Sequence, residues 1–133
     1  MSPHRLVRAY WRARPITHKE TQVTYFIGYG LRTNKGVDFH QGDRDLFFDK
    51  LVNLIEQVSG EVLFAGTGTG IWEGNAEPAG SITFIVPDVP DNEVHDFFTQ
   101  HLVDLAIEFE QDSIAFSNGN TLLVQANGEL VLT

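Results

Sequence analysis

The hydrophobic positions of the chain change period several times in its first half. Over residues 21–31 apolar side chains recur at every second position, which predicts a β-strand. From Asp43, a suitable N-cap, to the residue before Gly60 they recur at helical spacing, which predicts an amphipathic helix. Residues 61–72 again have strand character. The alternating glycines of the run 66–70 share one face there, which predicts a bend or a close approach by another backbone.

The second half shows the same kinds of pattern. A turn region over residues 73–80 leads to a short apolar strand at 81–87, and helical spacing returns from 91 to about 111. Strands follow at 113–117, 120–126 and 129–133. Asn118-Gly119 joins the first two and Asn127-Gly128 precedes the third, and Asn-Gly between alternating runs is the strongest short hairpin signal.

This order of elements predicts an α+β fold of the ferredoxin-like kind. It is β-α-β-β-α-β followed by a terminal hairpin or meander, with an antiparallel sheet and both helices on one face. We expect a basic arm over residues 1–20 and a single domain over 21–133. The strands carry more apolar side chains than one sheet face needs, namely Tyr25, Ile27, Phe64, Ile71, Trp72, Phe84 and Val86. The second face is therefore expected to pack against another subunit in a dimer or trimer.

Charge is distributed very unevenly along the chain. The 133 residues contain 9 Lys+Arg and 18 Asp+Glu, a formal net charge of −9. All the cationic residues fall within the first 50 positions, so the remainder is purely anionic. Such a body repels nucleic acid and attracts basic partners, and the arm is expected to lie on the acidic body of its own or a neighbouring subunit.

Several classes of protein are excluded by composition. The absence of cysteine removes disulfides, thiolate metal sites and cysteine nucleophiles. No apolar stretch has the length of a membrane span, and the basic arm lacks the apolar run of a secretory signal. We therefore expect a cytoplasmic protein that contacts no membrane and needs no cofactor.

The chain contains three short patterns: G-x-W-x-G at 70–74 with Glu77-Pro78 after it, F-x-Q-[DE]-S-[VI] at 109–114, and Phe26-Ile27-Gly28. In these patterns it resembles a family of small bacterial proteins of unknown function with a ferredoxin-like core. The resemblance spans about residues 21–117. In architecture the chain is similar to PII-type signalling proteins, which are trimers that bind nucleotides between subunits. Residues 51–133 lack the basic residues of such a site, so nucleotide binding of that type is not expected.

Two groups of residues could carry acid–base or metal chemistry. Asp38, His40 and Asp43 offer carboxylate and imidazole ligands to a divalent ion, although Asp43 is more simply a helix cap. His101 lies within the apolar arc predicted for the second helix, with Asp104 and Glu108 at its edge. A histidine there could act as an acid or base near neutral pH, or be a core residue with one satisfied hydrogen bond.

Two other groups could bind a partner. Trp72, Glu73 and Glu77 flank the predicted hairpin loop. The second helix carries an acidic stripe that includes Asp96, Asp104 and Glu108, with apolar Val103 and Ile107 among the polar positions. Exposed apolar groups rimmed by charge often mark an interface.

Three hypotheses of function follow. The first is an acidic oligomeric binding or regulatory module that engages a basic protein. The second is a phage- or mobile-element-encoded inhibitor that mimics nucleic acid. The third is a cofactor-free enzyme of the ferredoxin-like dimer type acting on a small hydrophobic substrate, with His40 or His101 as base. Since no catalytic motif is present, the sequence favours the first hypothesis over an enzyme.

Overall fold

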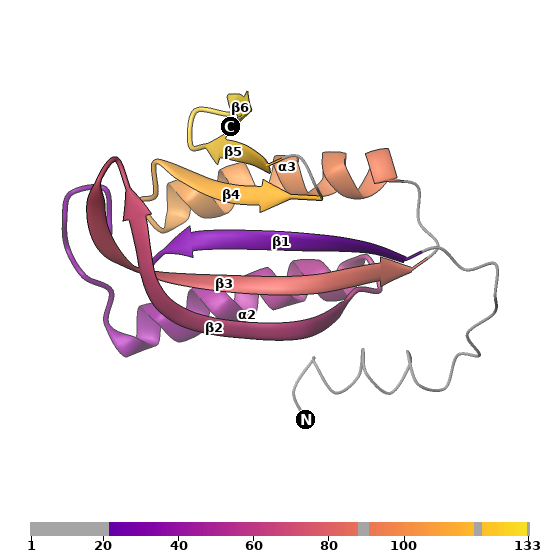
Figure 1. Ribbon diagram of the computed structural model, residues 1–133, viewed down its shortest axis with the longest axis horizontal. Coiled ribbons are helices and arrows are strands. Elements are labelled where there is room, and N and C mark those ends of the chain that lie inside the picture. The colour runs from indigo at the N-terminus through magenta and orange to yellow at the C-terminus, as the bar shows by residue number, and fades with distance from the viewer. Residues whose placement is uncertain (1–21, 88–90, 119–120, 133) are drawn as a thin grey trace.

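The chain folds as one antiparallel sheet with two helices on one of its faces (Figure 1). The computed structural model describes residues 22–87, 91–118 and 121–132. Along the chain the elements are β1 (Gln22–Gly30), α2 (Gln41–Gln57), β2 (Glu61–Trp72), β3 (Asn75–Pro87), α3 (Asp91–Glu108), β4 (Ser113–Ser117), β5 (Thr121–Gln125) and β6 (Leu130–Leu132). The strand order is β2-β3-β1-β4-β5-β6. The α+β class is thus confirmed, and the order is consistent with a ferredoxin-like arrangement.

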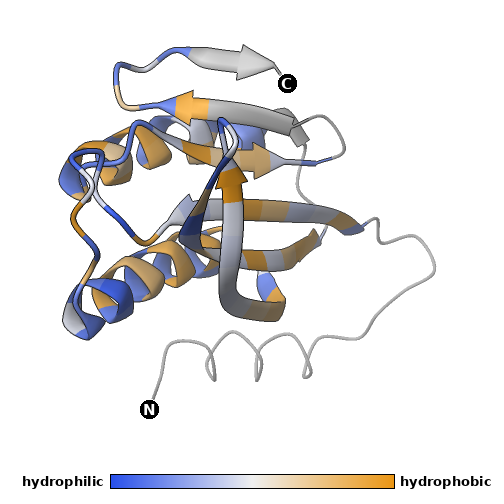
Figure 2. Cartoon of the chain, turned by 60° about the vertical axis from the view of Figure 1, so that its left-hand side comes forward, coloured by the Kyte–Doolittle hydropathy of each residue, from blue (hydrophilic) through white to orange (hydrophobic). Residues whose placement is uncertain are grey.

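The central strand β1 separates the sheet into two unlike faces. Its odd-numbered side chains, among them Tyr25, Ile27 and Tyr29, are buried against the helices. Its even-numbered positions, from Gln22 to Gly30, are exposed or half-buried. Successive strand residues point to opposite faces, so the second set lies on the side away from α2 and α3, which we call the open face. Hydrophobic residues of both described helices face the sheet (Figure 2).

Aromatic rings join the layers of the core. Tyr25 stacks between Phe84 of β3 and Phe116 of β4, at centroid distances of 5.4 and 5.6 Å. Phe47 of α2 stacks on Phe109 at 4.3 Å, just after the end of α3. Buried aromatic pairs of this kind add about 0.5–1.5 kcal/mol each beyond their area burial. Ring contacts therefore add to the aliphatic packing that holds the helices to the sheet and to each other.

The first helix begins and ends differently from the prediction. The sequence predicts Asp43 as N-cap, but the N-cap is His40, whose backbone N–H donates to the Asp43 carboxylate at 3.3 Å. At the other end, Ser59 takes the left-handed conformation with φ 57°. The N–H groups of Ser59 and Gly60 then bond to the carbonyls of Glu56 and Ile55, which is a Schellman motif. Gly60 is needed for space, since a Cβ there would lie 2.7 Å from Ile55 Cγ2.

The loop predicted over residues 73–80 does not exist. Glu73 and Gly74, with φ of 49° and 81°, form a two-residue turn, and β3 begins at Asn75. Positive φ at both central residues is the mark of the type I′ hairpin turn, whose twist matches that of the strands. Pro78 lies inside β3, and its carbonyl accepts the N–H of Leu31 at 2.9 Å. The β2–β3 hairpin is therefore long, and it curls over the open face (Figure 1).

Of the arc predicted for the second helix, Val94, Phe98, Leu105 and Phe109 are buried and His101 is the exception. Leu102 and Ala106 are fully buried, whereas His101 is only half-buried, with its ring 4.5 Å from that of Phe97. The helix ends at Glu108, before the predicted end near 111, and Glu110 takes φ 51°. Neither described helix has the length and apolar character that a membrane crossing requires.

The C-terminal strands pair as a meander, as predicted. β4 pairs with β5 and β5 with β6, all antiparallel. Gly128 has φ 88°, in agreement with the turn predicted at Asn127-Gly128. The arm over residues 1–20 and the glycine of Asn118-Gly119 lie outside the described residues.

Tyr29 gives the fold a measurable dependence on alkaline pH. Its side chain is 6% exposed, and burial raises its pKa from 10.0 to about 12. Above pH 10 the unfolded chain releases this proton while the folded chain keeps it, so the free energy of unfolding falls until the pH reaches about 12. The loss approaches about 3 kcal/mol, because one pKa unit corresponds to about 1.4 kcal/mol.

We expect urea denaturation of the wild type to show this fall and the Tyr29→Phe variant to lack it. Below pH 10 Tyr29 is protonated in both states, so the two proteins should differ there by a constant amount. Parallel stability curves up to about pH 11 would contradict the assignment.

Candidate functional site

A groove of about 920 Å³ lies on the open face, under the curled β2–β3 hairpin. Two neighbouring cross-strand rows at its floor contain only small residues: Gly28, Ser81 and Gly66 in one, and Gly30, Ala79 and Gly68 in the next. A Cβ placed at Gly66 or Gly68 would meet nothing within 4 Å. At these two positions the floor is therefore bare peptide backbone with free space above it, whereas Gly28 is covered by the Phe26 ring and Gly30 by the Gln111 side chain.

Aromatic side chains stand at both ends of this floor. Phe26 and Phe64 lie opposite Thr83 in the next row, and they are 38% and 67% exposed. Trp72, near the hairpin tip, is 42% exposed. Large apolar groups are seldom left in water without reason, so their placement around one cavity favours a binding surface.

All three sequence patterns that carry the family resemblance contribute to the lining of the groove. Phe26 and Gly28 come from the pattern Phe26-Ile27-Gly28, the segment from Gly70 to Glu73 from G-x-W-x-G, and residues 111–113 from F-x-Q-[DE]-S-[VI]. Glu77 and Pro78, which follow G-x-W-x-G, line the groove as well. Segments that are far apart in sequence are thus brought to one place by the strand order.

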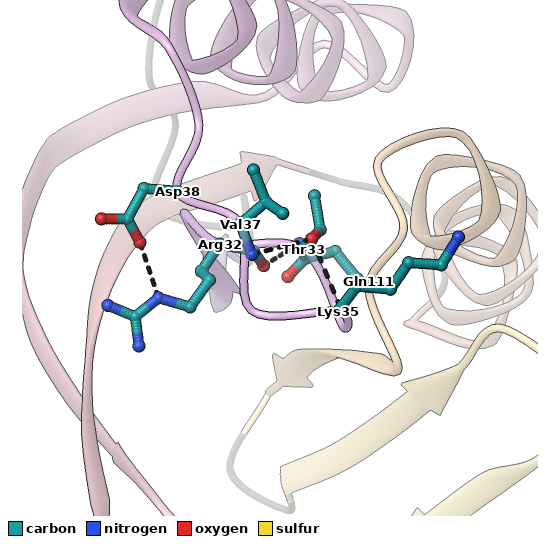
Figure 3. Close-up of polar contacts among 6 residues, drawn as sticks. All are labelled: Arg32, Thr33, Lys35, Val37, Asp38 and Gln111. Carbon is teal, nitrogen blue, oxygen red and sulfur yellow. Dashed lines mark hydrogen bonds and ion pairs between the residues drawn. The ribbon is translucent and has the colours of Figure 1, made fainter.

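The charged rim of the groove is built around Arg32. Its Nε donates to Asp38 Oδ1 at 2.6 Å, just beyond the end of β1 (Figure 3). This hydrogen bond raises the pKa of the guanidinium above its ordinary value, and the negative charge of Glu77 acts in the same direction. Arg32, Glu73, Glu77 and Asp112 are the charged residues of the lining.

Gln111 fixes this rim to the helix layer. The side chain is 5% exposed, and its Oε1 accepts the backbone N–H of Gly30 at 3.1 Å. Its Nε2 donates to the carbonyls of Arg32 and Phe109, at 2.9 and 3.2 Å. A Cβ at Gly30 would lie 2.7 Å from Oε1, so glycine is what lets the amide come this close.

The residues considered for a metal ion are engaged otherwise. Asp38 is bonded to Arg32, and Asp43 accepts the His40 backbone N–H. Among the described residues, no three His, Cys, Asp or Glu side chains come together in the way that a metal site requires.

The two histidines considered as bases lie away from the groove. His40 is exposed at the start of α2 and His101 is half-buried on α3, and neither belongs to the lining. The lining does include Trp72, Glu73 and Glu77, which the sequence singled out together. It also includes Arg32, Gln111 and the open glycines, which sequence reasoning did not assign to a site. The pattern F-x-Q-[DE]-S-[VI], which contains Gln111, was the available signal.

The acidic residues of α3 form a separate surface. Asp96 and Asp104 are exposed, and Glu108 is bound by Lys50 of α2 through Nζ–O distances of 2.6 and 2.8 Å. Ile107 is 59% exposed among them, as the sequence predicts, whereas Val103 is half-buried against the core.

Comparison with known proteins found few similarities. No family model matches the sequence, and no curated protein matches it. The structure is similar to a phage SAM lyase solved in complex with S-methyl-5′-thioadenosine, at 13% identity and a TM-score of 0.47, over 84% of this chain and 87% of that one. It is also similar to a phage SAM lyase in the apo state, at 12% identity and a TM-score of 0.49, over 89% and 91% of the two chains.

We predict that Gln111→Met lowers the free energy of unfolding by about 1–3 kcal/mol, since it leaves the Gly30 N–H without its partner. Urea denaturation measures the change. Gln100→Met, at an exposed position of α3, is the matched control and should stay within about 0.5 kcal/mol of the wild type. Equal effects of the two substitutions would show that the Gln111 amide does not hold the rim.

Proposed function

We propose that the protein is a homo-oligomeric binding module whose copies pack together through the open face of the sheet. The observation that carries this proposal is the chemical contrast between that face and the rest of the chain. Its central rows hold only glycine, alanine, serine, threonine and phenylalanine. On strands β1, β2 and β3 the charged residues are Glu61 and Glu77, and both lie toward the ends of their strands.

Electrostatics favours this face for self-association. Two chains of net charge −9 repel each other, and carboxylates brought face to face lose hydration without gaining a partner. The uncharged rows let two copies approach without that cost. Phe26 and Phe64 would supply the apolar contact, and burial of such rings contributes about 25 cal/mol per Å² removed from water.

We assign the strand order β2-β3-β1-β4 to the ferredoxin-like fold, with β5 and β6 as an extension. In this arrangement the helices cover one sheet face, and the part of the other face outside the curled β2–β3 hairpin is left for assembly. The likeness in architecture to the trimeric PII-type proteins supports a dimer or trimer. The acidic α3 lies on the helical side, so assembly through the open face would leave it accessible.

Sedimentation velocity at micromolar concentration tests the assembly. We expect a dimer or trimer for the wild type. Phe64→Glu and Thr24→Glu each place a carboxylate on the open face and should raise the dissociation constant at least about tenfold, which is about 1.4 kcal/mol. Leu46→Glu is the matched control, because Leu46 is also exposed, at 46%, but lies on α2. A monomeric wild type, or dissociation by the control as well, would overturn the proposal.

We further propose that the acidic surface of α3 binds a basic partner protein. Asp96 and Asp104 are exposed, and the exposed Ile107, one turn after Asp104, offers an apolar contact. Lys50 holds only Glu108 of this stripe.

A synthetic peptide that alternates arginine and leucine tests this second surface. We expect the double variant Asp96→Lys, Asp104→Lys to bind it about tenfold more weakly than the wild type, with a strong dependence on salt. The control Asp45→Lys, Asp49→Lys changes the net charge equally, at exposed positions of α2. If both variants lose affinity to the same degree, the attraction is that of net charge alone and the surface is not a site.

A further inference from the structure

The groove has the size and composition of a small-molecule site. Its volume of about 920 Å³ lies within the range of ligand pockets, about 300–1,000 Å³. The floor at Gly66 and Gly68 consists of exposed strand backbone, and a side chain added at either position would project into open space. Glycine in a strand interior weakens the strand, and a ligand that must approach the backbone closely is one reason to keep it. A flat ligand can therefore lie directly on the peptide planes.

The aromatic side chains at the two ends of the floor limit the kind of ligand that could bind there. Alternate residues of a strand share a face, so Phe64, Gly66, Gly68, Gly70 and Trp72 of β2 lie on one face. Phe64 is therefore at one end of the glycine floor and Trp72 is beyond its other end. A planar apolar group on the glycines would thus have ring faces or edges at both ends. Offset and edge-on contacts of this kind favour an aromatic ligand over a flexible aliphatic one.

The charge of the lining selects the sign of the ligand. Three carboxylates, those of Glu73, Glu77 and Asp112, are accompanied by one guanidinium. That guanidinium, on Arg32, is bound to Asp38, which is not part of the lining. An anion in the groove would thus be repelled by the excess of carboxylates. A cation would be attracted both by these negative charges and by the faces of the aromatic rings.

The hairpin register provides a specific place for a cation. Trp72 pairs with Asn75, and Gly70 pairs with Glu77, so Trp72 and Glu77 are diagonal neighbours on one face. Diagonal pairs lie about 7–8 Å apart, within reach of aromatic and long side chains. Gly70 places no side chain between ring and carboxylate, but a Cβ there would lie 3.1 Å from that of Ala79, so the open space for a ligand lies on the Gly68 side of this pair. A cation there would contact the indole face and the carboxylate together.

We propose that the groove binds a small aromatic cation. Its ring lies on Gly66 and Gly68, and its positively charged end is directed toward Trp72 and Glu77. The groove is lined by residues of one chain, so the inference goes beyond the proposed assembly and does not depend on it, although Phe26 and Phe64 belong to both surfaces.

Isothermal titration calorimetry with three probes of similar shape tests the ligand class. N-methylquinolinium is the aromatic cation, quinoline at neutral pH is its uncharged analogue, and 1-naphthoate is the anion. We expect the cation to bind about tenfold more tightly than quinoline and the anion to show no binding. Equal affinity for cation and neutral probe, or preference for the anion, would overturn the proposal.

Two substitutions locate the bound probe. Gly68→Leu fills the floor and should abolish binding, whereas Gly42→Leu adds the same side chain at an exposed glycine of α2 and should leave binding unchanged. Glu77→Gln should weaken the cation about tenfold while quinoline is unaffected. Binding that survives Gly68→Leu, or a loss with Glu77→Gln that is the same for both probes, would place the probe elsewhere.

The Thr24→Glu variant separates this inference from the proposed assembly, because Thr24 lies on the open face but does not line the groove. If this variant sediments as a monomer and binds N-methylquinolinium as the wild type does, the site belongs to one chain. If its binding is lost together with assembly, the single-chain site is wrong while the oligomer stands.

Discussion

The division of β1 into two alternating sets of side chains is the constraint on which the rest of the structure depends. β1 is paired on both edges, with β3 and β4, so its pleat sets the faces of the whole sheet. Because Tyr25 is stacked between Phe84 and Phe116 on the helical side, the intervening positions must face the other way. A shift of one residue in register would expose the core rings and bury the glycines, which excludes the alternative pairing. The groove is thus a consequence of core packing.

The periodic elements could be predicted from the sequence, and the features that depend on contacts could not. The period-two pattern of β1 and the helical spacing of α2 are local, and both were found. The turn at Glu73-Gly74 was missed because Pro78 and nearby turn residues suggested a loop, whereas Pro78 lies in β3 beside Leu31, just past the end of β1. His101 was placed in the core by an ideal helical wheel, and the real packing buries Leu102 instead.

For the candidate site, too, the sequence could indicate only residues that are close together along the chain. Trp72, Glu73 and Glu77 could be singled out as neighbours because they are close in sequence. The contribution of Gln111 and Gly30 could not, since the two are brought together only by the strand order. Of the two alternatives expected for the glycines of β2, the strand does bend (Figure 1), but no other backbone among the described residues approaches Gly66 or Gly68, where a Cβ would meet nothing within 4 Å.

The Gln111 amide connects the groove rim with the end of α3. One planar group clamps the last residue of β1, the rim at Arg32 and the carbonyl of Phe109 just past α3. An amide cannot rotate without releasing several of these bonds together. The groove rim is therefore joined by one side chain to the residue that follows α3, next to Glu108 and its ion pair with Lys50 of the other helix. Loss of this amide would remove the hydrogen bonds of the rim and of the end of α3 together.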